Sequence, residues 1–128
     1  MRRTLHLVFA AAILLPCIGA APPASAQSKP LQVQESNIEG VNAELTEATL
    51  RDGVLTVKLR FRNTGSKPAY TKIVYDSGDI DKYYVVAGKT KLLPLRDSEK
   101  VPLMSALSSS GHIDPEIKPG GSYLFWVK

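Results

Sequence analysis

The sequence predicts an all-β fold, an antiparallel β-sandwich, from three observations. One ten-residue stretch alternates between apolar and polar side chains, an Asp-Gly pair comes just before it, and several short strand-like runs separated by turn residues follow. No window of useful length beyond the first 26 residues has the period of a helix. Short strands with turns between them are typical of a sandwich.

The alternating stretch covers residues 54–63, with apolar side chains at odd positions and polar ones at even positions. The odd set is Leu55, Val57, Leu59 and Phe61, and the even set is Thr56, Lys58, Arg60 and Arg62. Successive side chains of a strand point to opposite faces of a sheet. We therefore expect one buried face and one solvent-facing face.

Asp52-Gly53 predicts a two-residue hairpin turn, because both residues of that pair tolerate the positive φ that such a turn requires. The turn sets the cross-strand register. Its pairs are Leu50 with Leu55, Ala48 with Val57, Thr49 with Thr56, and Glu47 with Lys58. This register places apolar residues together on one face and opposite charges together on the other.

The parity of the apolar residues changes upstream of that hairpin. Val41, Ala43 and Leu45 do not continue the face formed by Ala48 and Leu50. Either a β-bulge between Leu45 and Ala48 or a strand that crosses from one sheet to the other would account for the change.

Four further strands are expected at 69–75, 82–87, 91–95 and 123–127, with a turn at 76–79 and a loop-rich stretch at 96–118. Tyr83 and Tyr84 are adjacent in one of these strands, so their side chains should point to opposite faces.

The N-terminus has the order of regions found in a secretory signal. Arg2 and Arg3 precede an apolar run at 5–18, and Ala24-Ser25-Ala26 forms a small-x-small cleavage site. We expect a signal peptide at 1–26 that is cleaved near Ala26, a flexible leader at 27–37, and a β-sandwich domain at 38–128. The protein is then exported, periplasmic or extracellular, with no transmembrane segment after signal removal.

Cys17, the only cysteine, offers an alternative, because bacterial lipoproteins carry lipid on a cysteine at the end of the apolar run. Pro16 before it fits that pattern poorly, and the small-x-small site favours cleavage nine residues later.

Removal of 26 residues from 128 leaves 102, which is enough for one domain. Without Arg2 and Arg3, 14 basic and 12 acidic residues remain, a net charge of +2. This balance gives no concentrated basic footprint for nucleic acid. Catalytic residues, a cofactor and a metal are not expected.

Two groups of residues suggest chemical sites, although each also fits an ordinary loop. Ser110, His112 and Asp114 are close in sequence, which suggests a hydrolase, but catalytic triads usually combine distant segments. A polar loop is the preferred interpretation. Aspartates at 76, 79 and 81 could offer oxygens to calcium, although their spacing does not match the calcium-binding loop of an EF-hand.

Five residues are candidates for surface binding. They are Lys58, Arg60, Arg62, Tyr84 and Trp126. The three cations form a stripe on the polar face that could meet anionic lipid, glycan or peptidoglycan. The two aromatic residues could stack on a sugar, although aromatic residues in small sandwiches mostly pack in the core.

The segment at 54–65 with Lys67-Pro68, together with the later runs at 83–86, 93–99 and 119–126, resembles exported bacterial immunoglobulin-like domains. The similar group has no assigned activity and is sometimes found ahead of an OmpA-like peptidoglycan-binding domain. The resemblance implies an immunoglobulin-like sandwich over about 40–127. Those domains usually continue for another strand or two, whereas this sequence stops at Lys128.

The leading functional hypothesis is an exported, non-catalytic binding or scaffolding module of the cell envelope, with an envelope protein or peptidoglycan as partner. The alternative is an assembly subunit, a homodimer or strand-exchange partner, that uses an unpaired edge at 123–127. A hydrolase that uses His112 is the least favoured hypothesis.

Overall fold

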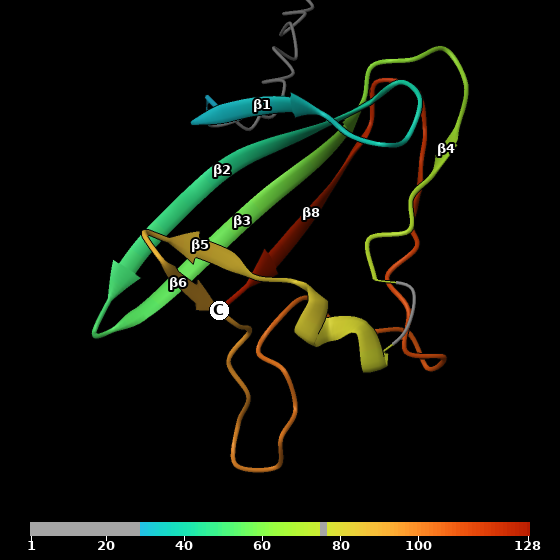
Figure 1. The fold of residues 1–128 in the computed structure, drawn as a ribbon. Helices are drawn as coiled ribbons and strands as arrows, with labels where there is room; N and C mark the ends of the chain where they lie inside the picture. Colours follow the sequence, from blue (N-terminus) through green and yellow to red (C-terminus); the bar gives the residue numbers. More distant parts are fainter. Residues whose placement is uncertain (1–28, 75–76) are drawn as a thin grey trace, which may run out of the picture.

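The main sheet of the protein has four antiparallel strands in the order β1-β2-β3-β8 (Figure 1). It is seen in a computed structural model that describes residues 29–74 and 77–128. The strands are β1 (Gln32–Glu35), β2 (Val41–Arg51), β3 (Val54–Asn63) and β8 (Ser122–Val127). The expected all-β class is therefore confirmed.

Smaller elements lie against one face of this sheet. Strands β4 (Ala69–Tyr70) and β7 (Glu116–Ile117) pair with each other, and β5 (Val85–Ala87) pairs with β6 (Thr90–Leu92) in a hairpin. A 3₁₀ helix, η1 (Ser77–Lys82), precedes the hairpin (Figure 1). These short pieces do not form a continuous second sheet, so the described elements do not close into a complete sandwich.

The hairpin of β2 and β3 has the expected turn and register. Asp52 and Gly53 have φ values of 50° and 78°. The four expected cross-strand pairs are all present, from Leu50 opposite Leu55 to Glu47 opposite Lys58. The register then shifts between Leu45 and Glu47, so the change of parity is a β-bulge.

Three local expectations are corrected. Gln32–Glu35, expected within a flexible leader, forms β1 and pairs with β2. The strand expected at 69–75 is reduced to β4 and an isolated bridge between Val74 and Ile113. Part of the turn expected at 76–79 is the start of η1. Packing in the core accounts for the helix in place of a turn. Ile80 of η1 is 1% exposed, and the helical backbone directs its side chain into the core.

The core lies between the inner face of the main sheet and the smaller elements. Its buried members are Ile73, Val74, Ile80, Met104, Ile113 and Phe125, and Leu59, Phe61 and Tyr123 pack against it. At its upper end, Asn63 is 1% exposed. The Asn63 Nδ2 atom donates to the carbonyl oxygens of Lys67 and Ile117 at 2.7 and 2.8 Å, which joins β3 to two loops.

The two faces of β3 differ less in burial than the alternation predicts. Leu59 and Phe61 pack against the core, whereas Leu55 and Val57 are half-buried beside an open groove. On the opposite face, Arg60 is paired with Glu44 and its side chain is only 11% exposed. The expectation of a closed apolar face and a fully solvated polar face is therefore wrong in detail.

The expected signal peptide and Cys17 lie outside the described residues. In the parts of the chain at 29–74 and 77–128, no helix has the length and apolar character required to cross a bilayer.

Candidate ligand groove

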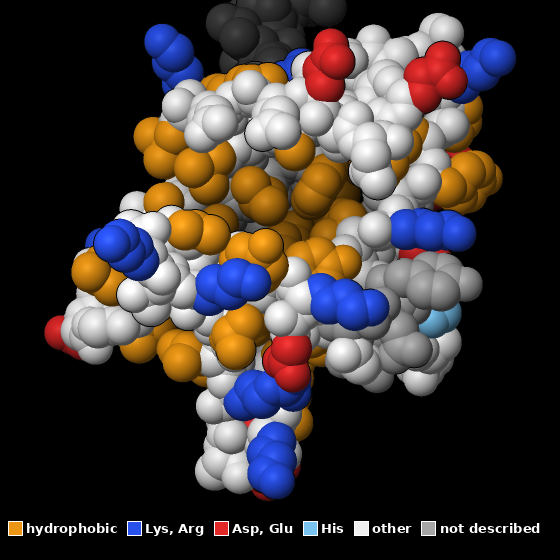
Figure 2. All heavy atoms as spheres, viewed as in Figure 1, with side chains coloured by type: hydrophobic (Ala, Val, Ile, Leu, Met, Phe, Trp, Pro, Cys, Tyr) orange, Lys and Arg blue, Asp and Glu red, His pale blue; other side chains and the backbone are white. Residues whose placement is uncertain are grey.

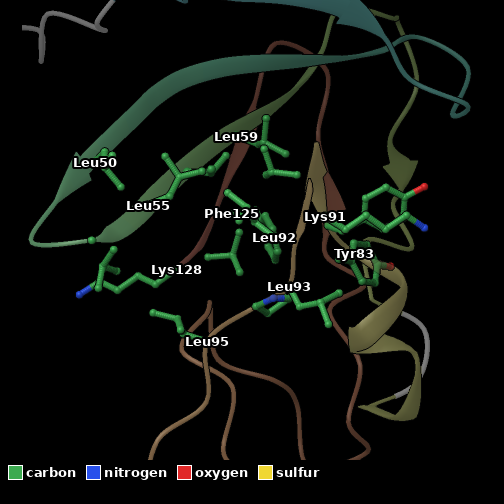
Figure 3. A pocket seen from close by; sticks show the side chains of 17 residues that line it. Leu50, Leu55, Leu59, Tyr83, Lys91, Leu92, Leu93, Leu95, Phe125 and Lys128 are labelled. Atoms are coloured by element: carbon green, nitrogen blue, oxygen red, sulfur yellow. The ribbon is translucent and has the colours of Figure 1, made fainter. Parts of the chain in front are cut away.

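An apolar groove of about 520 Å³ lies between the main sheet and the β5–β6 hairpin. Figure 2 shows it as a hollow with hydrophobic side chains in its floor. The sheet contributes Leu50, Leu55, Val57, Leu59, Phe125 and Val127. The hairpin and the residues beside it contribute Tyr83, Tyr84, Val85, Leu92, Leu93 and Leu95. In Figure 3, side chains from both layers point into the same space.

The groove stays open because the β5–β6 hairpin is too small to cover the sheet beneath it. Each of its strands has only three residues, and all six are exposed. Large apolar side chains consequently remain in contact with solvent, including Leu50 at 68% and Leu93 at 54% exposure. A soluble protein normally buries such a cluster or uses it for binding.

Hydrogen bonds hold the base of the hairpin, just before β5 and just after β6. On the β5 side, the Tyr83 N–H donates to Ile80 of η1 at 3.1 Å, and the Tyr83 hydroxyl donates to the carbonyl of Ile73. On the β6 side, the Leu95 N–H donates to the carbonyl of Lys128 at 2.7 Å. The hairpin is therefore fixed at its base and free at its tip.

The charged side chains that line the groove are both cationic. They are Lys91, on β6, and Lys128, directly after β8. The Lys91 Nζ atom lies 4.2 Å from the centre of the Tyr84 ring, a cation–π contact that positions the ammonium group at the rim. In Figure 3, Lys91 and Lys128 lie on opposite sides of the groove. Among the described residues, no Asp or Glu lines it.

Four of the five surface candidates lie together, but on the opposite face of the sheet from the groove. Lys58 is opposite Trp126 in the register of β3 and β8, and Arg60 and Arg62 continue the same face. The Lys58 ammonium contacts Glu47 Oε2 at 2.7 Å, and Arg60 contacts Glu44. These contacts reduce the net positive charge that the stripe can offer an anionic ligand.

Tyr84 is the one surface candidate that lines the groove. Tyr84 is 49% exposed, whereas Tyr83 packs against the core. Both residues precede β5 and both line the groove, so the expected strand with the two rings on opposite faces is not found. The groove itself was not predicted. The signals that could have indicated it are the apolar run Leu92-Leu93-Pro94-Leu95 after so short a hairpin and the exposed Leu50 beside the turn.

The segment that suggested a hydrolase, around Ser110 and His112, forms a local turn. Ser108 Oγ and Ser110 Oγ are 2.9 Å apart, and the backbone N–H of His112 donates to Ser108 Oγ at 3.0 Å. Of the aspartates weighed for calcium, Asp76 and the side chain of Asp79 lie outside the described residues, and Asp81 pairs with Arg96 at 2.8 Å. Within the described ranges, no cluster of three or more His, Cys, Asp or Glu could hold a metal ion.

Strand β8 is at one edge of the main sheet, as the expectation of an edge at 123–127 requires, and residues 103–105 cover part of that edge near Trp126 and Lys128. The Ser105 N–H donates to the carbonyl of Trp126 and the Lys128 N–H to the carbonyl of Leu103, both at 2.9 Å. Met104 forms a bridge with Val127 in the same segment. The loop-rich stretch thus supplies backbone partners that its irregular sequence did not predict.

Comparisons of the chain with protein-family models, with curated proteins and with solved structures found no match. The groove and its surroundings are therefore the basis for the functional proposal.

Proposed function

We propose that this protein is an exported, non-catalytic binding module of the cell envelope, and that an apolar ligand binds in the groove between the main sheet and the β5–β6 hairpin. The fold proposed for it is an immunoglobulin-like sandwich that is open at one end. The order of regions at 1–26 supports export. The resemblance at 40–127 supports the sandwich, although a fold does not define a function.

The observation that carries the proposal is the groove itself. Its volume of about 520 Å³ falls in the range of about 300–1,000 Å³ typical of small-molecule sites. Fourteen of its 17 lining residues have apolar or aromatic side chains, and they come from two different layers. A ligand that fills the space would remove Leu50, Leu93 and their neighbours from water, which is the driving force expected for binding.

The basic stripe on the opposite face is a weaker candidate for binding a glycan or peptidoglycan. Two of its three cations contact glutamates, and Arg60 is largely covered. An anionic ligand would have to compete with those glutamates, whereas the groove can take an apolar ligand without breaking an ion pair of the described residues.

The proposal is tested with an uncharged, environment-sensitive dye such as Nile red, titrated with protein expressed from the full 128-residue sequence. We expect saturable binding with a blue-shifted emission. Leu93→Gln should weaken dye binding by about five-fold, because a partly exposed leucine contributes about 1 kcal/mol to apolar contact.

Leu124→Gln is the matched control. Leu124 is 53% exposed, almost the same as Leu93 at 54%, but it lies on the opposite face of the sheet. Dye binding to this variant should equal that of the unmodified protein. The absence of saturable binding, or an equal loss in both variants, would reject the groove as a ligand site.

A further inference from the structure

We infer that the groove binds a fatty acid, with the alkyl chain between the two layers and the carboxylate at Lys91. This inference rests on the proposed function and adds the class of ligand. It combines three observations: the shape of the groove, its lining, and the sign of the charge at its rim.

The groove is long enough for an extended alkyl chain. Its floor follows β3 from Gly53, in the turn, to Leu59. Six residue steps along a strand span about 20 Å. Apolar side chains line this whole length from both layers, and Figure 3 shows Leu55 and Leu59 of β3 and Leu92 of the hairpin around the same space. A flexible, unbranched chain can follow such a path without presenting a polar group to it.

The rim of the groove supplies a cation for an anionic end group. Lys91 makes no ion pair within the described residues, and its contact with Tyr84 leaves the ammonium charge in place. An ammonium group beside an apolar surface attracts a carboxylate more strongly than one in open solvent, because the local dielectric constant is lower. Within residues 29–74 and 77–128, the lining contains no acidic side chain that would repel that carboxylate.

The choice of a free fatty acid over a membrane surface follows from the position of the apolar residues. They lie on the walls and floor of a hollow between two layers (Figure 2), where a single chain can enter. A bilayer surface requires apolar and basic side chains on a projecting, accessible face.

The test measures displacement of the bound neutral dye by three compounds with the same chain: dodecanoate, dodecanol and dodecylamine. We expect dodecanoate to displace the dye at about one-fifth of the dodecanol concentration, as one favourable charge contact provides. Dodecylamine should be the weakest of the three. The preference for dodecanoate should shrink at high salt.

Lys91→Gln should remove the preference for dodecanoate over dodecanol. Lys118→Gln, which removes the same charge from the turn at the other end of the sheet, should retain the preference. Lys128→Gln should also retain most of it, because the inference places the carboxylate at Lys91.

Equal displacement by dodecanoate and dodecanol, or a preference that survives Lys91→Gln, would overturn the fatty-acid inference while the groove remains an apolar site. Failure of the neutral dye itself to bind would instead reject the proposed function. Binding to anionic phospholipid vesicles without uptake of soluble dodecanoate would also overturn the inference and identify a membrane surface as the occupant.

Discussion

Asn63 shows how one side chain can connect segments that are far apart in sequence. Its amide nitrogen donates to the carbonyl oxygens of Lys67 and Ile117, and its Oδ1 atom accepts the Gly65 N–H at 2.9 Å. The residue ends the alternating strand and closes the turn that follows. A buried amide is stable only because all three contacts satisfy its polar atoms.

Asn63→Ala should lower the free energy of unfolding by about 2–4 kcal/mol, because it removes the donor to the carbonyl oxygens of Lys67 and Ile117. Urea unfolding followed by circular dichroism measures the loss. Asn37→Ala, at an exposed position, should change stability by less than about 0.5 kcal/mol. A similar small effect of Asn63→Ala would contradict the role given to its side chain.

The ion pair between Glu47 and Lys58 should make stability depend on pH. The hydrogen bond from Lys58 lowers the pKa of the Glu47 carboxyl below its ordinary value of 4.5. A lowered folded-state pKa stabilises the fold above the unfolded-state value, and this stabilisation is lost as the pH falls through the folded-state pKa. Glu47→Gln should therefore be less stable than the unmodified protein at pH 7.

Urea midpoints of both proteins, measured from pH 7 to pH 2.5, check this expectation. Their difference should be largest above pH 4.5 and should shrink steadily below it. Glu39→Gln serves as control, since that exposed glutamate forms no ion pair within the described residues. A midpoint difference that stays constant across the range would show that the ion pair does not cause it.

At the scale of single elements, the β2–β3 hairpin is the part that local sequence specifies most completely. Its turn depends on two residues with positive φ, and its register depends on alternation that extends away from that turn. Both signals lie within about twenty consecutive residues. The bulge at Thr46 belongs to the same unit, where the Thr46 hydroxyl donates to the carbonyl of Lys58 at 3.2 Å.

Gly53→Ala should destabilise the protein by about 1–2 kcal/mol through the backbone alone, the usual cost of a side chain in the left-handed region. A Cβ atom at Gly53 would meet nothing within 4 Å, so no steric clash contributes. Asp52→Asn should be neutral, because Asn also tolerates a positive φ. Thermal unfolding measures both, and an unchanged midpoint for Gly53→Ala would contradict this account of the turn.

The short elements between β3 and β8 were predicted less well, for a physical reason. Strand β4 has two residues, and the nearby Val74 pairs with Ile113, 39 positions further along the chain. Such pairing depends on long-range contacts, which local propensity does not report. The helix η1 also depends on tertiary packing, because its residue Ile80 is buried in the core.

At the scale of the whole molecule, uneven coverage of one sheet produces both the core and the groove. Near Phe61 and Tyr123 the smaller elements pack against the sheet, and these two side chains are partly buried beside the core. Near Leu55, the short β5–β6 hairpin and the residues at 93–95 lie over the sheet and leave a groove. The same apolar face is therefore used for stability at one end and remains available for a ligand at the other.

Hydrogen–deuterium exchange should show this difference directly. Backbone amides of the β5–β6 hairpin should exchange faster than those of β3, because the hairpin is exposed and is fixed only at its base. Saturating dodecanoate should slow exchange in the hairpin and leave the loop tip at 97–101 unchanged. Protection of the free hairpin equal to that of β3 would contradict the open groove.

The sequence by itself determined the all-β class, the Asp52-Gly53 turn, the register of β2 and β3 and the bulge, because each depends on near neighbours and on the two-residue period of a strand. Only the tertiary structure decided that the leucines at 92–95 come to lie over Leu55 and leave a groove. That outcome depends on the size of the covering hairpin and on backbone contacts between distant segments. Local patterns of residues do not report such long-range contacts.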